Sequence, residues 1–397
     1  MGALLSMEEA QRLILERALP LQAEPVALEE AAGRVLAEAA TAHVDLPPFD
    51  SSAMDGFAVR SSDTPGRLPV RERIAAGRPA ARALEPGEAM GIATGAAVPA
   101  GADAVIPIEY VADRGNEVEI EEVVTVGANV RSRGGDIGRG EVVVEAGERL
   151  GPAQIGALAA AGIPEIVCSR RPRAAVLATG TELRRPGEEL RPGEIYEANS
   201  SLLSVQLRSA GAEVERLATV EDDEAAHRAA LDAGLRADVL VTSAGVSVGP
   251  HDLVRSVGVE LGVEEVLWGV AVKPGKPLWF GVRDRTLVFG LPGNPVSSLV
   301  SFELFVRPAV LALQGIREPL PRLLPGRLAR AVRPNDARTE LMRARSTIAG
   351  STVELDVLGG QESHMIAAAA GADALVVIPP GREELAAGAA VSYLPLA

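Results

Sequence analysis

Leu287-Val288-Phe289-Gly290-Leu291-Pro292-Gly293-Asn294-Pro295 is the stretch that decides the fold, because an apolar run passes through a glycine- and proline-rich loop straight into a helical pattern. The spacing predicts a strand over 287–289 and a long helix over 295–313, with proline at the first helical position, where its missing N–H costs nothing. The preceding region repeats this alternation, with strands predicted at 174–179, 213–220 and 238–243 and helices at 200–210, 222–235 and 251–261. Such alternation indicates a central α/β/α domain with a mainly parallel sheet covered on both faces.

The segments on either side of this domain have other patterns. Residues 6–19 and 28–40 carry apolar positions at helical spacing, and a proline-initiated helix is predicted at 152–161. Between 47 and 145, short β-like runs separated by Gly and Pro predict a β-rich insertion domain, and five short strands in the tail predict a small C-terminal β-barrel. The predicted division is 1–46 with 146–168 as a helical linker and dimerisation domain, 47–145 as the β-rich domain, 169–318 as the α/β domain and 319–397 as the barrel.

The composition excludes several classes of partner. The formal net charge is −15, and so negative a surface repels nucleic acid and anionic lipid. The single cysteine, Cys168, excludes an intrachain disulfide and a cysteine cluster for zinc, which fits a reducing compartment. No secretory signal is visible, and no uninterrupted apolar run approaches the ~18 residues of a membrane span. We therefore expect a cytoplasmic protein with neither nucleic-acid nor membrane partners.

Only two of the 39 Lys+Arg residues are lysines, and both lie in the segment Val272-Lys273-Pro274-Gly275-Lys276-Pro277. A lysine ammonium is a compact point charge whereas guanidinium is a flat fork, so a site that places one small cation against a crowded oxyanion cannot exchange them freely. The Pro-Gly between the lysines favours a shaped loop that lets backbone approach a ligand. Our hypothesis is that the two lysines bind an oxyanion. The alternative is that two neighbouring lysines remain in the sequence by chance.

Four loops predicted to follow strands share small residues and a few polar side chains. They are 178–183, 243–252, 273–277 and 290–298, and they include Gly180, Ser247, Gly249, Gly293 and Asn294. Loops of this kind at helix starts present N–H groups that suit a phosphorylated ligand, although each alone is equally an ordinary strand-to-helix turn. Carboxylates beside an anion repel it unless a cation lies between them. The acidic residues in or near these loops are therefore candidate Mg²⁺ ligands or water-positioning groups. These are Glu182, Asp222, Asp223 and Asp252, of which Asp222 is also a candidate helix N-cap.

Taken together, these strings resemble the molybdopterin molybdenumtransferases, a family that includes the gephyrin E domain. The matching segments occur in family order along nearly the whole chain. They are Leu46 to Val59, Thr94 to Ala96 with Gly101 to Val105, Arg131 to Ile137, Thr179 to Leu183, Gly245 to Gly249, Lys273 to Pro277 and Gly290 to Ser297. Neither a P-loop nor a Rossmann glycine fingerprint is present, which disfavours the standard nucleotide sites.

The resemblance implies an enzyme that inserts molybdate into adenylylated molybdopterin with release of AMP, using Mg²⁺. It implies a homodimer whose active site lies between the α/β domain of one subunit and the β-rich domain of the other. The catalytic candidates are Asp55, Asp136, Glu182, Lys273 and Lys276, and the metal candidates are Glu182 and Asp252. The substrate-binding candidates are Thr94, Gly180, Asp222, Ser247, Gly249, Pro292, Gly293, Asn294, Pro295 and Ser363. Without the resemblance, the Asp-Gly at Asp55 would be read as a turn.

Several departures and two alternatives accompany this resemblance. Phe57 stands where the family usually has tyrosine, and Ser51 stands where it often has asparagine. Ala244 stands where the family usually has glycine, and Gly269 stands where many relatives have a basic residue. One alternative is a molybdopterin adenylyltransferase, which would need only the α/β domain, and the other is a non-catalytic, gephyrin-like scaffold. The expected protein partners are molybdopterin adenylyltransferase and the molybdoenzyme apo-proteins.

Overall fold

A six-stranded sheet with the strand order β16-β13-β17-β21-β20-β18 forms the centre of the α/β domain. In that order the strands are β16 (Glu213–Arg216), β13 (Arg173–Ala178), β17 (Val239–Ser243), β21 (Thr286–Leu291), β20 (Trp279–Arg283) and β18 (Glu264–Trp268). The first four pair in parallel, and β20 runs antiparallel to both of its neighbours, so β18 points the same way as the first four. The prediction of a mainly parallel sheet is confirmed.

Helices cover both faces of this sheet, because alternate strand residues are apolar on both sides. Val176 packs in a cluster with α3, α6 and α7, whereas its neighbour Leu177 packs in a cluster with α4 and α5. The helices are α1 (Met7–Leu15), α3 (Asn199–Ser209), α4 (Glu224–Gly234), α5 (Leu253–Glu260), α6 (Pro295–Ser301) and α7 (Arg307–Leu313), with a π-helical turn (Phe302–Val306) between the last two. Within the described residues, the run Pro295–Leu313 is the one helix long and apolar enough to cross a membrane, and 72% of it is buried inside the protein.

The C-terminal strands close into a small barrel, as predicted, because β23 pairs with both β24 and β25. The barrel strands are β22 (Leu324–Leu328), β23 (Thr339–Ala349), β24 (Thr352–Val357), β25 (Ala374–Ile378) and β26 (Ala390–Pro395), and α8 (Ile366–Ala369) precedes β25. A short strand of the α/β domain, β19 (Val272–Lys273), adds to the barrel by pairing in parallel with β23. The lysine segment therefore joins the two domains.

The β-rich domain contains a six-stranded sheet with the order β7-β4-β6-β5-β9-β8. Its strands are β4 (Gly56–Val59), β5 (Gly66–Ile74), β6 (Ala89–Ile92), β7 (Ala104–Pro107), β8 (Val111–Asp113) and β9 (Glu117–Ile120), with the short pair β3 (Ser51–Ser52) and β10 (Val130–Arg131) beside them. Gly56 is required where β4 meets β7, because a Cβ there would lie 2.0 Å from the carbonyl oxygen of Ile106.

The connecting body between the α/β and β-rich domains corrects one prediction. Helix α2 (Pro152–Ala160) is present, but residues 28–40 do not form the expected helix. Instead, β1 (Ala23–Ala27) pairs with β12 (Glu165–Ser169), a 3₁₀ turn follows at Leu28–Glu30, and β2 (Ala40–Thr41) pairs with β11 (Val142–Val144). Val35 and Leu36 form bridges to residues 149 and 168, so long-range pairing overrides the helical propensity of this alanine-rich segment.

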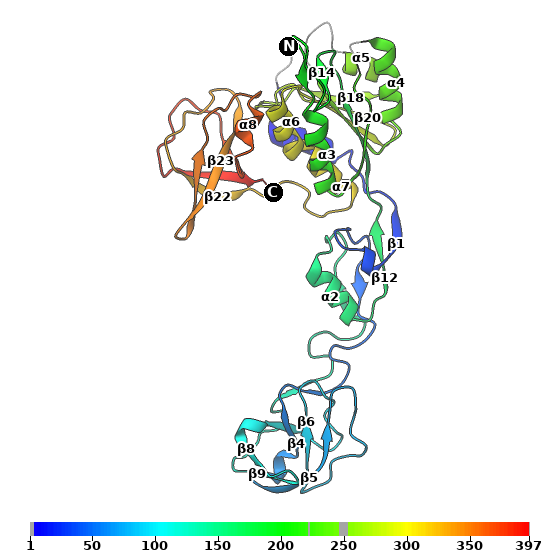
Figure 1. Cartoon of the computed structure of the whole chain (residues 1–397), viewed down its shortest axis with the longest axis vertical. Coiled ribbons are helices and arrows are strands. Elements are labelled where there is room, and N and C mark those ends of the chain that lie inside the picture. The colour runs from blue at the N-terminus through cyan, green and yellow to red at the C-terminus, as the bar shows by residue number, and fades with distance from the viewer. Residues whose placement is uncertain (1–3, 221–222, 246–252, 397) are drawn as a thin grey trace.

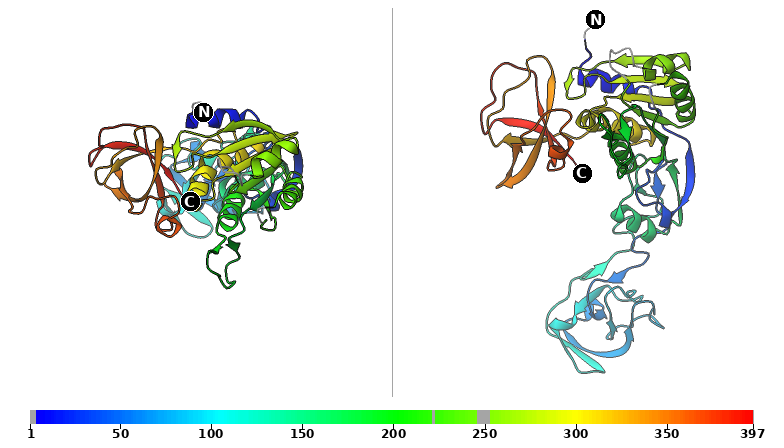
Figure 2. Two further views of the ribbon diagram at one scale, coloured as in Figure 1. Left: turned by 90° about the horizontal axis from the view of Figure 1, so that it is seen from above. Right: turned by 45° about the horizontal axis from the view of Figure 1, so that its top comes forward.

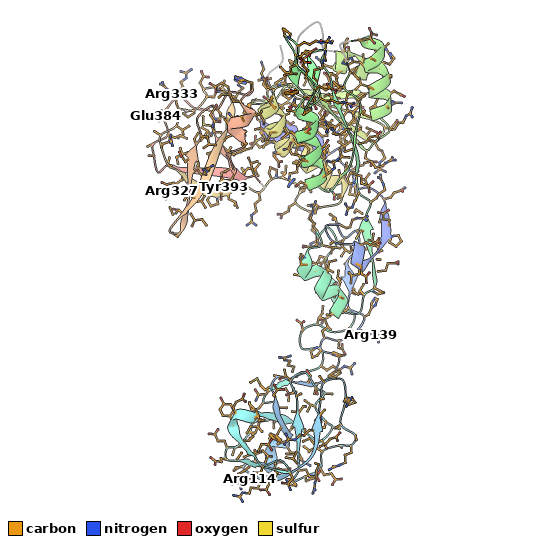
Figure 3. The ribbon with its side chains drawn as sticks, in the orientation of Figure 1. Arg114, Arg139, Arg327, Arg333, Glu384 and Tyr393 are labelled. Atoms are coloured by element: carbon orange, nitrogen blue, oxygen red, sulfur yellow. The ribbon has the colours of Figure 1, made fainter. Side chains whose placement is uncertain are left out.

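The computed structural model describes residues 4–220, 223–245 and 253–396 and is elongated (Figure 1). The α/β domain and the barrel lie side by side at one end, α2 with β1 and β12 lies in the middle, and the β-rich domain forms the far end. The view turned by 45° shows the same separation (Figure 2, right). Arg139 lies at the junction of the middle body and the β-rich domain (Figure 3), where its N–H donates to Asp45 at 2.8 Å.

Candidate active site

The candidate active site is a cavity of about 630 Å³ at the edge of the central sheet where β13, β17 and β21 end. Parallel strands bring the residues after their carboxyl ends to one edge, which is where ligands bind in folds of this kind. The start of α3 and one loop of the barrel complete the wall. The lining residues are Thr179, Glu182, Leu183, Ile195, Tyr196, Glu197, Ala198, Asn199, Ser243, Ala244, Gly245, Pro277, Pro292, Gly293, Asn294, Pro295, His364 and Ile366.

A larger cavity, of about 800 Å³, lies between α3, α7 and the end of the chain. Its wall is mostly leucine, proline and alanine, and it contains none of the predicted site residues. The smaller cavity is the better candidate because it gathers polar groups from several strand ends, as a site for a polar ligand requires.

Backbone conformation explains the small residues at the strand ends. Gly180 has a φ of +148°, and a Cβ there would lie 2.6 Å from Oε2 of Glu182, so the exposed Glu182 carboxylate folds back over a glycine. Ala244 has a φ of 74°, in the left-handed region that a residue with a Cβ adopts only at a cost of roughly 1–2 kcal/mol. Its methyl carbon would be 3.3 Å from a Cβ placed on Gly293. The departure from glycine at Ala244 therefore adds local strain and narrows this side of the cavity.

Asn199, the first residue of α3, ties two of the loops together. Its Nδ2 donates to Oγ of Ser243 at 2.5 Å and to the carbonyl oxygen of Gly293 at 2.7 Å. Its Oδ1 is buried and has no hydrogen-bond partner among the described residues. Glu197, buried beside it, lies 3.5 Å from Arg216. Asn199 was not among the predicted site residues, because an asparagine at a helix start is typical of ordinary capping.

The barrel contributes the predicted residue Ser363 to this site. Nδ2 of Asn294 donates to Oγ of Ser363 at 2.7 Å, and this contact brings His364 into the cavity wall. Arg343 is buried, with 2% of its surface exposed. Its guanidinium donates to the backbone carbonyls of residues 360, 362 and 365 and so holds the loop that contains Ser363. Burial lowers the pKa of Arg343. A guanidinium with several donors in a fixed fork is suited to holding a loop in this way.

The two lysines lie near the cavity but have different surroundings. Pro277 lines the cavity, whereas neither lysine does. Nζ of Lys273 is 2.8 Å from Oε1 of Glu340, a barrel residue whose side chain is 7% exposed. Lys276 forms no ion pair with any described residue. Glu340 was not among the predicted site residues, because a single glutamate 67 positions from Lys273 carries no local signal.

Three predicted residues lie far from this cavity in the same chain. Asp55 precedes β4, and its Oδ1 accepts a hydrogen bond from the N–H of Thr94 at 2.8 Å. Asp136 lies between β10 and β11, and its N–H donates to the carbonyl oxygen of Leu46. Figure 1 shows β4 and β6 at the opposite end of the molecule from α6, so a single chain does not bring these residues to the strand-end loops.

Four predicted site residues, Asp222, Ser247, Gly249 and Asp252, lie outside the described residues. The expectation that Asp222 caps the following helix is wrong by one residue. The N-cap of α4 is Asp223, whose Oδ2 accepts from the N–H of Ala226 at 2.8 Å. No group of three or more His, Cys, Asp or Glu side chains suited to a metal occurs within 4–220, 223–245 and 253–396.

Three family profiles match successive parts of the chain. The profile of the MoeA N-terminal region (domain I and II) matches residues 5–162, that of a probable molybdopterin binding domain matches 175–312, and that of the MoeA C-terminal region (domain IV) matches 325–396.

Full-length relatives give the same assignment. The chain is 38% identical over 399 residues to molybdopterin molybdenumtransferase 2 of Mycobacterium tuberculosis, covering 96% of this chain and 97% of that protein. It is 35% identical over 403 residues to the molybdopterin molybdenumtransferase of Haemophilus influenzae, covering 99% and 98%. Its structure matches that of a molybdopterin biosynthesis MoeA protein from Pyrococcus horikoshii with a TM-score of 0.86 at 28% identity, covering 99% and 100%.

Proposed function

The chain belongs to the molybdopterin molybdenumtransferase (MoeA) family, and on that premise we propose that it inserts molybdate into adenylylated molybdopterin and releases AMP. The observation that carries this proposal is the single cavity of about 630 Å³ in which the loops after β13, β17 and β21 meet Pro277 of the lysine segment and the barrel loop that bears Ser363. A phosphorylated ligand bound over these loops would lie next to the segment that carries the two lysines.

Charge neutralisation is the main chemistry that these residues can supply. The reaction brings an oxyanion up to a substrate that already carries phosphates, and a protein of net charge −15 opposes that approach. Lys276, without an ion-pair partner among the described residues, offers a local positive charge. Fixed positive charge at the reacting centre lowers the energy of anionic transition states as the anhydride bond breaks.

Mg²⁺ is the cation that we propose for this cavity, where substrate phosphates and water would supply most of its ligands. This ion is usually held by one or two carboxylates together with substrate phosphates, and the exposed Glu182 in the cavity wall is such a carboxylate. We assign Asp252 as a second candidate ligand. When bound, Mg²⁺ would neutralise charge on the substrate's phosphates.

A second copy of the chain would complete the site. Asp55, Thr94 and Asp136 belong to the β-rich domain, at the end of the molecule opposite the cavity. We propose a homodimer in which this domain of one subunit reaches the α/β domain of the other. We assign the enzyme to the cytoplasm, where molybdopterin adenylyltransferase would supply its substrate and molybdoenzyme apo-proteins would receive its product.

The direct test supplies purified protein with adenylyl-molybdopterin, molybdate and Mg²⁺ and measures AMP. We expect AMP release that depends on molybdate, and Lys276→Arg should lower turnover at least about tenfold, because a planar guanidinium cannot replace a point charge in a crowded site. No AMP release by the wild type would reject the proposed activity. Consumption of ATP without molybdate would indicate the adenylyltransferase instead.

Asp55→Ala tests the contribution of the β-rich domain. Its matched control is Asp63→Ala, because Asp63 also accepts one backbone hydrogen bond in this domain, from the N–H of Gly87 at 2.8 Å. We expect Asp55→Ala to lose turnover while Asp63→Ala keeps it. Equal turnover of the two variants would remove Asp55 from the catalytic residues.

A further inference from the structure

Glu340 is a buried carboxylate that the barrel presents to a lysine of the candidate site. Its side chain is 7% exposed, and its Oε1 lies 2.8 Å from Nζ of Lys273. The two residues are register partners in the parallel pairing of β19 with β23, so backbone hydrogen bonding fixes their relation. The pair is therefore a built contact between two domains.

The pair leaves the two lysines electrostatically unequal. Lys273 is partly exposed, with 43% of its side chain accessible, and shares its charge with Glu340. Lys276, three residues later, has no ion-pair partner among the described residues. Because opposite charges in contact largely cancel at a distance, an oxyanion at the lysine segment is attracted mainly by Lys276.

We propose that Glu340 is a positioning residue, which holds Nζ of Lys273 in place as a hydrogen-bond donor and cancels most of its charge, so that Lys276 supplies the net attraction for the oxyanion. The proposal rests on the proposed function, since it assigns the oxyanion substrate to this segment. A doubly charged anion could then bind reversibly, because only one of the two nearby ammonium groups has no carboxylate partner among the described residues and the total attraction stays moderate.

Direct binding of sodium molybdate, measured by calorimetry, separates charge from positioning. Glu340→Gln keeps the size of the side chain and removes its charge, so molybdate should bind at least about tenfold more tightly, which is the effect that one negative charge about 6 Å from a dianion has even at the dielectric constant of water. Turnover should nevertheless fall, because a neutral amide oxygen is a weaker acceptor than a carboxylate and holds Nζ of Lys273 less firmly. Glu340→Asp keeps the charge but shortens the arm, so affinity should stay near that of the wild type while turnover falls.

Two further variants guard against misfolding. Glu88→Gln is the matched control, because Glu88 is a similarly buried carboxylate paired with Arg71 and Arg82 in the β-rich domain, and it should change neither affinity nor turnover. The double variant Lys273→Met with Glu340→Gln removes the pair as a unit and leaves no uncompensated buried charge. Its molybdate affinity should fall by no more than about tenfold, because the variant loses one hydrogen-bond donor but the pair that it removes is neutral as a whole.

Unchanged or weaker molybdate binding by folded Glu340→Gln would overturn the proposal, as would a large loss of affinity in the double variant. Absence of molybdate binding by the wild type would overturn it as well. These outcomes are distinguishable from failure of the proposed function, which is decided by AMP release from the wild type. Tighter binding by Glu340→Gln in a protein that releases no AMP would support the charge assignment and reject the enzyme activity.

Discussion

Gly275→Ala should disrupt the lysine segment, and its effect can be estimated from the structure. Gly275 has a φ of +112°, which a residue with a Cβ adopts at a cost of roughly 1–3 kcal/mol. A Cβ there would also lie 2.7 Å from Oγ of the buried Ser301 and 3.5 Å from Cγ2 of Val272. Overpacking of this kind adds roughly 1–3 kcal/mol. We therefore expect a total loss of about 2–6 kcal/mol in the free energy of unfolding, or a displaced loop.

The matched control is Gly262→Ala in the same domain. Gly262 has a φ of +87°, but a Cβ there would meet no atom within 4 Å, so only the backbone cost applies. The difference of about 2 kcal/mol between the variants should appear as a melting temperature roughly 4–8 °C lower for Gly275→Ala. Molybdate binding should weaken in Gly275→Ala alone. Equal melting temperatures and equal molybdate affinities would refute the steric reasoning.

Three more predictions follow from single contacts. Burial alone would raise the pKa of Asp238, but hydrogen bonds from Arg170 and from the backbone N–H of Arg173 outweigh burial, so the pKa is lowered. The stability that this carboxylate contributes is therefore present above about pH 4 and is lost as the pH falls further. In Asp238→Asn the melting temperature should decrease less steeply with falling pH than in the wild type. Burial raises the pKa of the Cys168 thiol, so a thiol-specific dye should react only after unfolding, and rapid reaction of the native protein would contradict this. Asn199→Ala should raise KM for adenylyl-molybdopterin about tenfold, because the loop at Gly293 loses a partly buried hydrogen bond. Steady-state kinetics with unchanged KM would count against it.

Much of the α/β domain could be predicted from local patterns. The alternation of apolar runs with capped helical segments placed β13, β17, β21, α3, α4 and α5 within a few residues, since each element is specified by its own periodicity. Residues 28–40 show the limit of this reasoning. Their alanine-rich pattern favours a helix, but Leu36 bridges to Cys168 and β1 pairs with β12 more than 130 residues later. Such pairing depends on partners that no local window contains.

The candidate site divides in the same way. Residues with unusual local chemistry, such as the paired lysines and the strand-end glycines, are visible in the sequence because glycine and lysine are hard to replace there. Their supports are not visible, because Asn199 and Glu340 are ordinary residue types whose role depends on where the chain returns. Ala244 is an intermediate case, since its departure from glycine was visible but its φ of 74° was not.

Long-range contacts also explain why the barrel belongs to the site. Glu340 pairs with Lys273, and Ser363 accepts from Asn294, so two separate parts of the barrel touch two separate loops of the α/β domain. Backbone hydrogen bonds support both contacts, because β19 pairs with β23 and the N–H of Val296 donates to the carbonyl oxygen of Ser363 at 3.1 Å. Each loop is therefore held to the barrel by both side-chain and backbone contacts. Fixing both loops at once limits the conformational freedom that substrate binding would otherwise have to remove. If the proposal for Glu340 holds, the barrel would act on the oxyanion through the position of Lys273.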